Sequence, residues 1–157
     1  MQNLCEGEPK SQTNIGWLYH QGLSVEKDLE KAAEWYRKAA EQEYVIAQHN
    51  LGTMYEHGWG IEQSYAEAVK WYQFGVDKAY GPSLFNLGML YLNGLGVKAD
   101  RNIAIHHLRS AHALKVSEAT NKLKELGVEI AEDTPISHTP QPQPARHHNL
   151  TRETKEP

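Results

Sequence analysis

The sequence predicts an all-α solenoid, in which pairs of helices stack one after another along the chain. Three observations support this prediction. One block of sequence recurs at an interval of 36 residues, and a fixed period of this size is typical of stacked supersecondary units. Apolar residues within each block follow the spacing of an amphipathic helix. Four positions keep the same residue in every block: Gly16, Gly52 and Gly88; Tyr19, Tyr55 and Tyr91; Gly22, Gly58 and Gly94; and Ala32, Ala68 and Ala104.

The first helix of the first block is predicted from about Pro9 to Gln21. Gly22 follows it directly, where a left-handed C-terminal cap favours glycine because glycine has no Cβ. The helix is therefore expected to end there. The residues predicted to share its core-facing side are Ser11, Ile15, Leu18 and Tyr19.

The second helix of each block is predicted to begin after a residue whose side chain accepts backbone N–H bonds. Ser64 and Glu67 additionally match the S-x-x-E capping box, in which each side chain caps the other residue's backbone. The three predicted N-caps are Asp28, Ser64 and Asp100.

One glycine per block falls inside the first helix, where glycine costs about 0.8 to 1 kcal/mol relative to alanine. A close approach of the two helices of the pair offsets this cost. We expect the glycines at positions 16, 52 and 88 to face the small alanines at positions 32, 68 and 104.

The period divides the chain into units. A helix after position 116 departs from the repeat, because Lys124 and Gly127 stand where the glycine and tyrosine are expected. We interpret it as a terminal capping helix. Beyond it, a proline-rich polar stretch predicts a disordered tail. The predicted units are an N-terminal remnant at 1–8, repeats at 9–44, 45–80 and 81–116, the capping helix at 117–130 and the tail at 131–157.

The repeated unit resembles the Sel1-like repeat, a relative of the tetratricopeptide repeat. The three copies read NIGWLYHQGLSVEKDLEKAAEWYRKAAEQ, NLGTMYEHGWGIEQSYAEAVKWYQFGVDK and NLGMLYLNGLGVKADRNIAIHHLRSAHAL. The resemblance covers about residues 9–126, with departures at Ser24, His107 and Leu108. It implies a right-handed α-solenoid of antiparallel helix pairs whose first helices line a concave surface, and it implies a role as an adaptor or scaffold for other proteins.

Composition excludes several classes of partner. The net charge is −4, and the basic residues are scattered rather than clustered, so binding to nucleic acid or to an anionic membrane surface is not expected. Cys5 is the only cysteine, which excludes an internal disulfide. No stretch resembles a signal peptide or a membrane span. We expect a soluble, cytoplasmic chain; a signal peptide lost at a boundary before Met1 would change that compartment.

No arrangement of residues predicts catalysis, a cofactor or a metal site. The glycine-containing loops at 58–60 and 94–96 lack the preceding strand and the Lys-Ser/Thr pair of a phosphate-binding loop, so we assign them to capping and turning. The histidine pairs 49 with 57 and 106 with 107 lack a chelating spacing on a helix. We therefore predict a protein that is not an enzyme.

The informative positions vary between blocks while the scaffold repeats. On the first helix of each block they form a stripe off the core face, which is expected to line the concave groove. The stripe contains Thr13, Trp17 and His20; His49, Thr53 and Glu56; and Phe85, Met89 and Leu92. Its residues change from polar and aromatic to apolar, which suits a peptide with an apolar anchor. The predicted partner-binding residues are Trp17, His20, His49, Thr53, Glu56, Phe85 and Met89.

Trp17 is the strongest of these candidates, because no packing need common to all repeats requires it and Trp is a favoured hot-spot residue. Phe85, Met89 and Leu92 have a second interpretation, in which they pack under the capping helix. Three functions remain open: an interaction module, a self-associating fragment of a larger scaffold, and an enzyme or regulator of the cell envelope. Self-association predicts a mass that depends on concentration, and an enzyme predicts a closed pocket with a perturbed ionisable residue.

Overall fold

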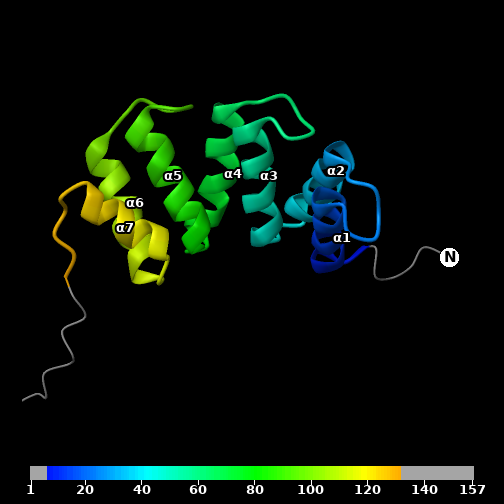
Figure 1. Cartoon of the computed structure of the whole chain (residues 1–157), viewed down its shortest axis with the longest axis horizontal. Helices are drawn as coiled ribbons and strands as arrows, with labels where there is room; N and C mark the ends of the chain where they lie inside the picture. The colour runs from blue at the N-terminus through cyan, green and yellow to red at the C-terminus, as the bar shows by residue number, and fades with distance from the viewer. Residues whose placement is uncertain (1–6, 132–157) are drawn as a thin grey trace, which may run out of the picture.

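A computed structural model of the chain describes residues 7–131. This part contains seven α-helices and no strand, which confirms the predicted all-α repeat fold. Figure 1 shows the helices following one another along the long axis of the molecule, from α1 at one end to α7 at the other. The helices are α1 (Pro9–Gln21), α2 (Leu29–Glu41), α3 (Val45–His57), α4 (Tyr65–Asp77), α5 (Gly81–Asn93), α6 (Arg101–Ala113) and α7 (Ser117–Glu125).

The helices pack in sequence order. The three repeats are the pairs α1–α2, α3–α4 and α5–α6, and each pair also packs on the next through its second helix. α7 closes the series by packing on α6, where Ala119 and Leu123 are fully buried. The capping helix is therefore confirmed, although it ends at Glu125, and the rest of the segment predicted at 117–130 continues without helix past Gly127, whose φ is 68°.

The predicted caps form, with side-chain N-caps on the second helix of each pair and glycine C-caps on the first. Asp28 Oδ1 accepts a hydrogen bond from the Lys31 amide at 3.0 Å, and Asp100 Oδ1 accepts from the Ile103 amide at 3.0 Å. At the C-terminal ends of α1, α3 and α5, the glycines at positions 22, 58 and 94 are left-handed, with φ of 70°, 69° and 66°. Because these signals act within one turn, the sequence predicted the limits of the first helix correctly.

The predicted capping box forms only in part. Ser64 Oγ accepts a hydrogen bond from the Glu67 amide at 3.2 Å. The Glu67 carboxylate does not complete the box; it accepts a hydrogen bond from Lys70 Nζ at 2.9 Å instead. The reason is that the Ser64 N–H already donates to the Tyr55 carbonyl at 2.9 Å, so this donor has no need of a carboxylate.

The glycines inside the first helices do mark a close approach. A Cβ on Gly16 would lie 2.8 Å from ring carbons of Tyr36, and a Cβ on Gly52 would lie 2.8 Å from those of Tyr72. The ring supplies the nearest contact, with the Ala32 carbonyl oxygen next at 3.2 Å from the position on Gly16. Glycine at these positions therefore makes room for a tyrosine ring rather than only for a small alanine.

The core-facing side of α1 differs from the prediction. Its buried residues are Gln12, Thr13 and Gly16, whereas the predicted Ser11, Ile15, Leu18 and Tyr19 are only half-buried. The reason is positional, because no helix pair precedes α1 in the described part of the chain. The residues of α3 that correspond to the first three predicted ones pack on the preceding repeat and are fully buried; they are Ala47, Leu51 and Met54.

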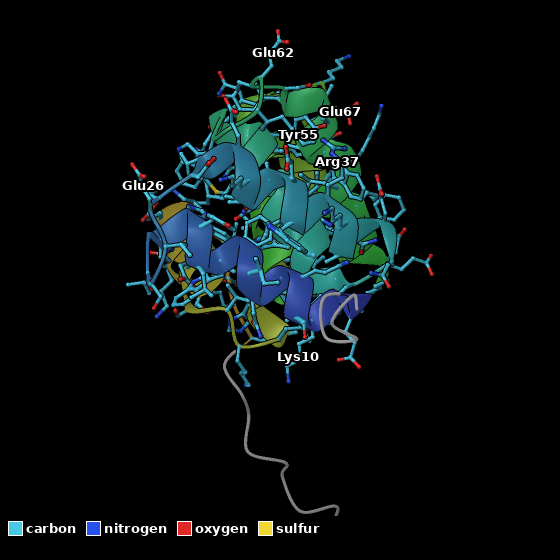
Figure 2. The ribbon with its side chains drawn as sticks, turned by 90° about the vertical axis from the view of Figure 1, so that its right-hand side faces the viewer. Lys10, Glu26, Arg37, Tyr55, Glu62 and Glu67 are labelled. Carbon is cyan, nitrogen blue, oxygen red and sulfur yellow. The ribbon has the colours of Figure 1, made fainter. Side chains whose placement is uncertain are left out.

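A cation–π and hydrogen-bond contact also joins the first two repeats. Arg37 Nη2 on α2 donates a hydrogen bond to the Tyr55 hydroxyl on α3 at 2.7 Å. The guanidinium lies 5.7 Å from the centroid of the same ring. Figure 2 shows these two side chains next to each other, seen from the α1 end of the molecule. None of the described helices has the length and apolar character needed to cross a membrane.

The loops inside the second and third repeats rest on the preceding repeat through a glycine with positive φ. Gly60 has a φ of 67°, and a Cβ there would lie 2.2 Å from the carbonyl carbon of Leu29. Gly96 makes the same contact with Tyr65, at 2.5 Å. In the first repeat this position is Ser24, which has a φ of 61° and carries a Cβ. The first repeat therefore has a side chain at the position where the other two have a glycine that contacts the preceding repeat.

We predict that Gly60→Ala lowers the free energy of unfolding by about 2 to 4 kcal/mol, because it adds left-handed strain and a clash with backbone that cannot move aside. Urea denaturation followed by far-UV circular dichroism measures the change. Ser24→Ala is the matched control and is expected to change stability little, since a Cβ is already present. Equal effects of the two substitutions would show that the contact on Leu29 is unimportant.

Candidate functional site

The predicted binding residues lie on α1, α3 and α5, and we call the side of the solenoid that carries them the helix-A face. Trp17 lies on α1 with 47% of its surface exposed. Thr53 and Met89 occupy the equivalent positions on α3 and α5 and are half-buried. The structure thus leaves a large indole ring open to solvent at one end of this face.

Aromatic rings gather beside α1, where two repeats meet. The ring of His20 lies 5.3 Å from that of Trp59 and 6.3 Å from that of Tyr36. His57 stacks on Trp59 with a centroid distance of 4.3 Å. Burial lowers the pKa of His20, and the nearby Lys27 lowers it further. His20 therefore presents an uncharged ring at neutral pH.

Trp59 is a surface residue that sequence reasoning missed, because its loop was assigned to capping and turning. It is 37% exposed and contacts His20 of the preceding repeat. The available signal is its variation between repeats, since leucine occupies the equivalent positions 23 and 95.

His49 is enclosed where the second and third repeats meet. Its Nδ1 shares a hydrogen bond of 3.1 Å with Ser83 Oγ on α5. Its ring centroid lies 5.4 Å from those of Tyr72 and Tyr80. Burial lowers the pKa of His49 to about 4, so the ring is neutral at physiological pH. This side chain joins two repeats, and whether it also touches a partner remains a prediction.

A polar network occupies the middle of the helix-A face. The Tyr72 hydroxyl donates a hydrogen bond to Glu56 Oε2 at 2.5 Å and accepts one from Asn86 Nδ2 at 3.0 Å. The Thr53 hydroxyl lies 3.2 Å from the Tyr72 hydroxyl oxygen. Burial raises the pKa of Tyr72, and the negative charge of Glu56 raises it further. The hydroxyl therefore stays protonated and holds the Glu56 carboxylate in place.

The α5 end of the face is apolar. Phe85 is half-buried against a cluster that includes Leu84, Leu108 and Leu123, the last of these on α7. This packing agrees with the second interpretation given above for Phe85. Its removal is expected to disturb the end of the solenoid as well as any partner contact.

Other candidate groups do not assemble into a site. Within residues 7–131, no cluster of three His, Cys, Asp or Glu side chains has the arrangement to hold a metal ion. Cys5 and the histidines at positions 147 and 148 lie outside the described residues, as do most of the predicted remnant at 1–8 and of the predicted tail at 131–157.

Comparison with known proteins identifies the family. The family model described as Sel1 repeat matches residues 9–44, 45–79 and 81–114. The chain belongs to the Sel1 repeat family. Sel1 repeat proteins typically mediate protein–protein interactions and are generally non-catalytic scaffolds. Comparison with curated proteins finds no match.

Solved structures of other Sel1 repeat proteins resemble this one. A Sel1 repeat protein from Oxalobacter formigenes is 36% identical, with a TM-score of 0.71 over 79% of this chain and 51% of that chain. A protective antigen present in uropathogenic Escherichia coli strains, which displays an SLR fold, is 37% identical, with a TM-score of 0.73 over 76% of this chain and 26% of that chain. This chain therefore spans about half of the first relative and about a quarter of the second.

The Helicobacter pylori cysteine-rich protein B shares the fold, with a TM-score of 0.59. It is 19% identical over 73% of this chain and 96% of that one. At this identity the likeness concerns the fold alone.

We predict that Tyr72→Phe lowers the free energy of unfolding by about 1 to 2 kcal/mol, because Glu56 and Asn86 lose their shared partner in a half-buried setting. Tyr36→Phe is the matched control, because Tyr36 occupies the same position in the first repeat and its hydroxyl takes no part in this network. Urea denaturation of the two variants and the wild type measures the difference. A smaller loss for Tyr72→Phe than for the control would contradict this account of the network.

The half-buried His49 makes stability depend on pH. Its pKa in the folded chain is about 4, below the ordinary 6.5, so the unfolded chain binds the proton more readily. The stability that His49 contributes is fully present above pH 6.5 and is lost as the pH falls toward 4. From about pH 7.5 to about pH 5, we expect the wild type to lose about 2 kcal/mol more stability than His49→Gln.

Urea denaturation of both proteins at the two pH values measures this difference. His20 and the carboxyl groups titrate in both proteins, so their contributions cancel in the comparison. Parallel losses of stability would mean that His49 does not titrate in this range in the folded state.

Proposed function

We propose that the chain is a non-catalytic interaction module that binds a protein or peptide segment through its helix-A face. The observation that carries the proposal is the exposure of Trp17 and Trp59 on this side of the first repeat junction, at 47% and 37%. Large exposed aromatic residues are the side chains that most often carry binding energy in protein interfaces. The interaction role typical of the Sel1 family supports the same function.

The chemistry of the helix-A face indicates the kind of segment that fits. Trp17, Trp59 and the neutral ring of His20 form an aromatic end, and Met89 belongs to an apolar end. The Glu56 carboxylate lies between them, fixed by Tyr72. A helical or extended segment with apolar anchors at both ends and a polar or basic middle complements this order.

The predicted binding residues separate into two groups by what they contact inside the chain. His49 joins the second repeat to the third, Thr53 joins the two helices of the second repeat, and Phe85 packs on the cluster shared with α7. Trp17 and His20 are proposed to contact the partner, together with Met89, the added Trp59 and Glu56, whose carboxylate also accepts the internal hydrogen bond from Tyr72. An alanine substitution in the first group changes the fold as well as the surface, so the test of binding uses the second group.

Self-association is the second candidate function, and one observation favours it. Ile15 and Leu18 on α1 are half-exposed, although their counterparts on α3 are fully buried against a preceding repeat. A second copy could cover this side of α1. Such a copy cannot stack in the register of the other repeats, because the Ser24 side chain occupies the place of the contact made by Gly60.

We predict that the double variant Trp17→Ala, Trp59→Ala loses a partner that the wild type captures from a lysate of the source organism, because both exposed rings are removed. Phe74→Ala is the matched control, since Phe74 lies on α4 outside the predicted groove and is also 47% exposed. Captured proteins are compared by quantitative mass spectrometry, and circular dichroism verifies equal helicity.

The controls separate the outcomes of this experiment. A partner retained by the double variant and lost by Phe74→Ala would move the binding site to the even-numbered helices. Capture of no partner by the wild type, together with a mass that rises with concentration in sedimentation, would favour self-association instead.

A further inference from the structure

The two junctions between repeats are built differently on the side of the even-numbered helices. In the first two repeats one position of the second helix is a tryptophan, Trp35 and then Trp71, and in the third repeat it is His107. The smaller ring leaves space at the second junction. Two neighbouring positions, one on the same helix and one at its C-cap, also carry a smaller or less polar side chain in the third repeat, where Ser110 and Leu114 stand in place of Phe74 and Lys78.

The first junction is filled by large side chains. Trp71 packs against the buried cluster of α2 and α3, and Phe74 lies beside it with a centroid distance of 5.5 Å. At the edge, Lys78 Nζ donates hydrogen bonds to the Glu43 carbonyl and to Gln48 Oε1, the second at 3.2 Å. The Trp71 indole and the polar bridge therefore occupy this junction, and Phe74, which is 47% exposed, lies beside the indole at its outer edge.

At the second junction the equivalent side chains are smaller or apolar. His107 replaces Trp71, Ser110 replaces Phe74, and the polar bridge becomes the pair Leu114 and Leu84. A cleft of about 430 Å³ opens here between α4, α5 and α6. Its lining residues include no Asp, Glu, Lys or Arg; the cleft is lined mainly by Val76, Leu84 and Leu114 and by the polar His106, His107 and Ser110.

The polar groups at the cleft do not select a charged ligand. Burial lowers the pKa of His107, and the neighbouring His106 lowers it further, so the His107 ring is neutral at physiological pH. Its Nδ1 is buried and has no hydrogen-bond partner. An uncharged ligand therefore enters this cleft at a lower desolvation cost than an ion.

We propose that this cleft binds an aromatic side chain of a partner peptide, with the indole of tryptophan as the best fit. The repeat itself supplies the reason, because the Trp71 indole occupies the matching place in the first junction, with the Phe74 ring beside it at the edge. Leu114 is 47% exposed at the rim, so apolar surface continues beyond the cleft and suits a ring that belongs to a larger molecule. No Phe, Trp or Tyr follows Tyr91 in the sequence, so residues 132–157 cannot supply the ring.

The test titrates the full chain with N-acetyl-tryptophanamide at millimolar concentrations and follows backbone amides by NMR. We expect saturable shifts at Leu84, Ala113 and Leu114, and much smaller shifts with N-acetyl-leucinamide. His107→Trp restores the residue found in the first two repeats and fills the cleft, so the shifts are lost and the melting temperature rises. Ser110→Phe, which restores the residue equivalent to Phe74, gives the same loss by an independent substitution.

Trp17→Ala is the control for location, and it leaves these shifts unchanged because Trp17 lies on the helix-A face. The proposal is overturned if no saturable shift occurs, if folded His107→Trp and Ser110→Phe variants keep the shifts, or if the leucine probe binds equally well. A wild-type mass that rises with concentration, and that His107→Trp abolishes, would identify a second copy as the occupant and overturn the assignment to a partner peptide. This test is independent of the helix-A proposal, which fails or succeeds on the Trp17 and Trp59 variant.

Discussion

The contact between a tyrosine ring and a glycine backbone determines how the first two helix pairs are built. Tyr36 and Tyr72 approach the glycines on the facing helix so closely that a Cβ would lie 2.8 Å from the ring. Because the Tyr72 ring lies so close to α3, its hydroxyl reaches the Glu56 carboxylate on the helix-A face. In the third repeat the ring is replaced by Leu108, and the polar network extends only as far as Asn86 at the start of that repeat. One packing contact thereby decides both the closeness of the helices and the chemistry of the face.

Local physics explains what the sequence predicted correctly. Caps such as Asp28 and Gly22 act within one turn, so the extent of α1 and the start of α2 follow from neighbouring residues alone. The errors involve residues distant in the chain. Ile15 is half-exposed because no described pair precedes α1, and Glu67 leaves its capping box incomplete because a carbonyl from α3 already satisfies Ser64.

The candidate site was predictable to a smaller degree. Periodicity placed Trp17 on a variable stripe, and the structure does expose its side chain. Periodicity alone gave no means of recognising that His49 hydrogen-bonds Ser83 of the next repeat, because that contact depends on how two repeats are stacked. Trp59 was missed because the glycines on either side of it have a sufficient structural role. A repeated scaffold makes variable positions informative, but the contacts between repeats decide which of them are free.

The contact of Gly60 on Leu29 gives the solenoid a direction. The start of the second helix in one repeat contacts a glycine in the loop of the next repeat, and this glycine has no side chain to clash with the helix backbone. The third repeat can therefore follow the second. A further unit of the same kind inserted between them would meet a helix start on one side and a loop glycine on the other. A unit added ahead of the first repeat would meet Ser24 instead. Lengthening by duplication is thus compatible with the interior of the array, whereas a unit packed on Ser24 must leave room for its Cβ.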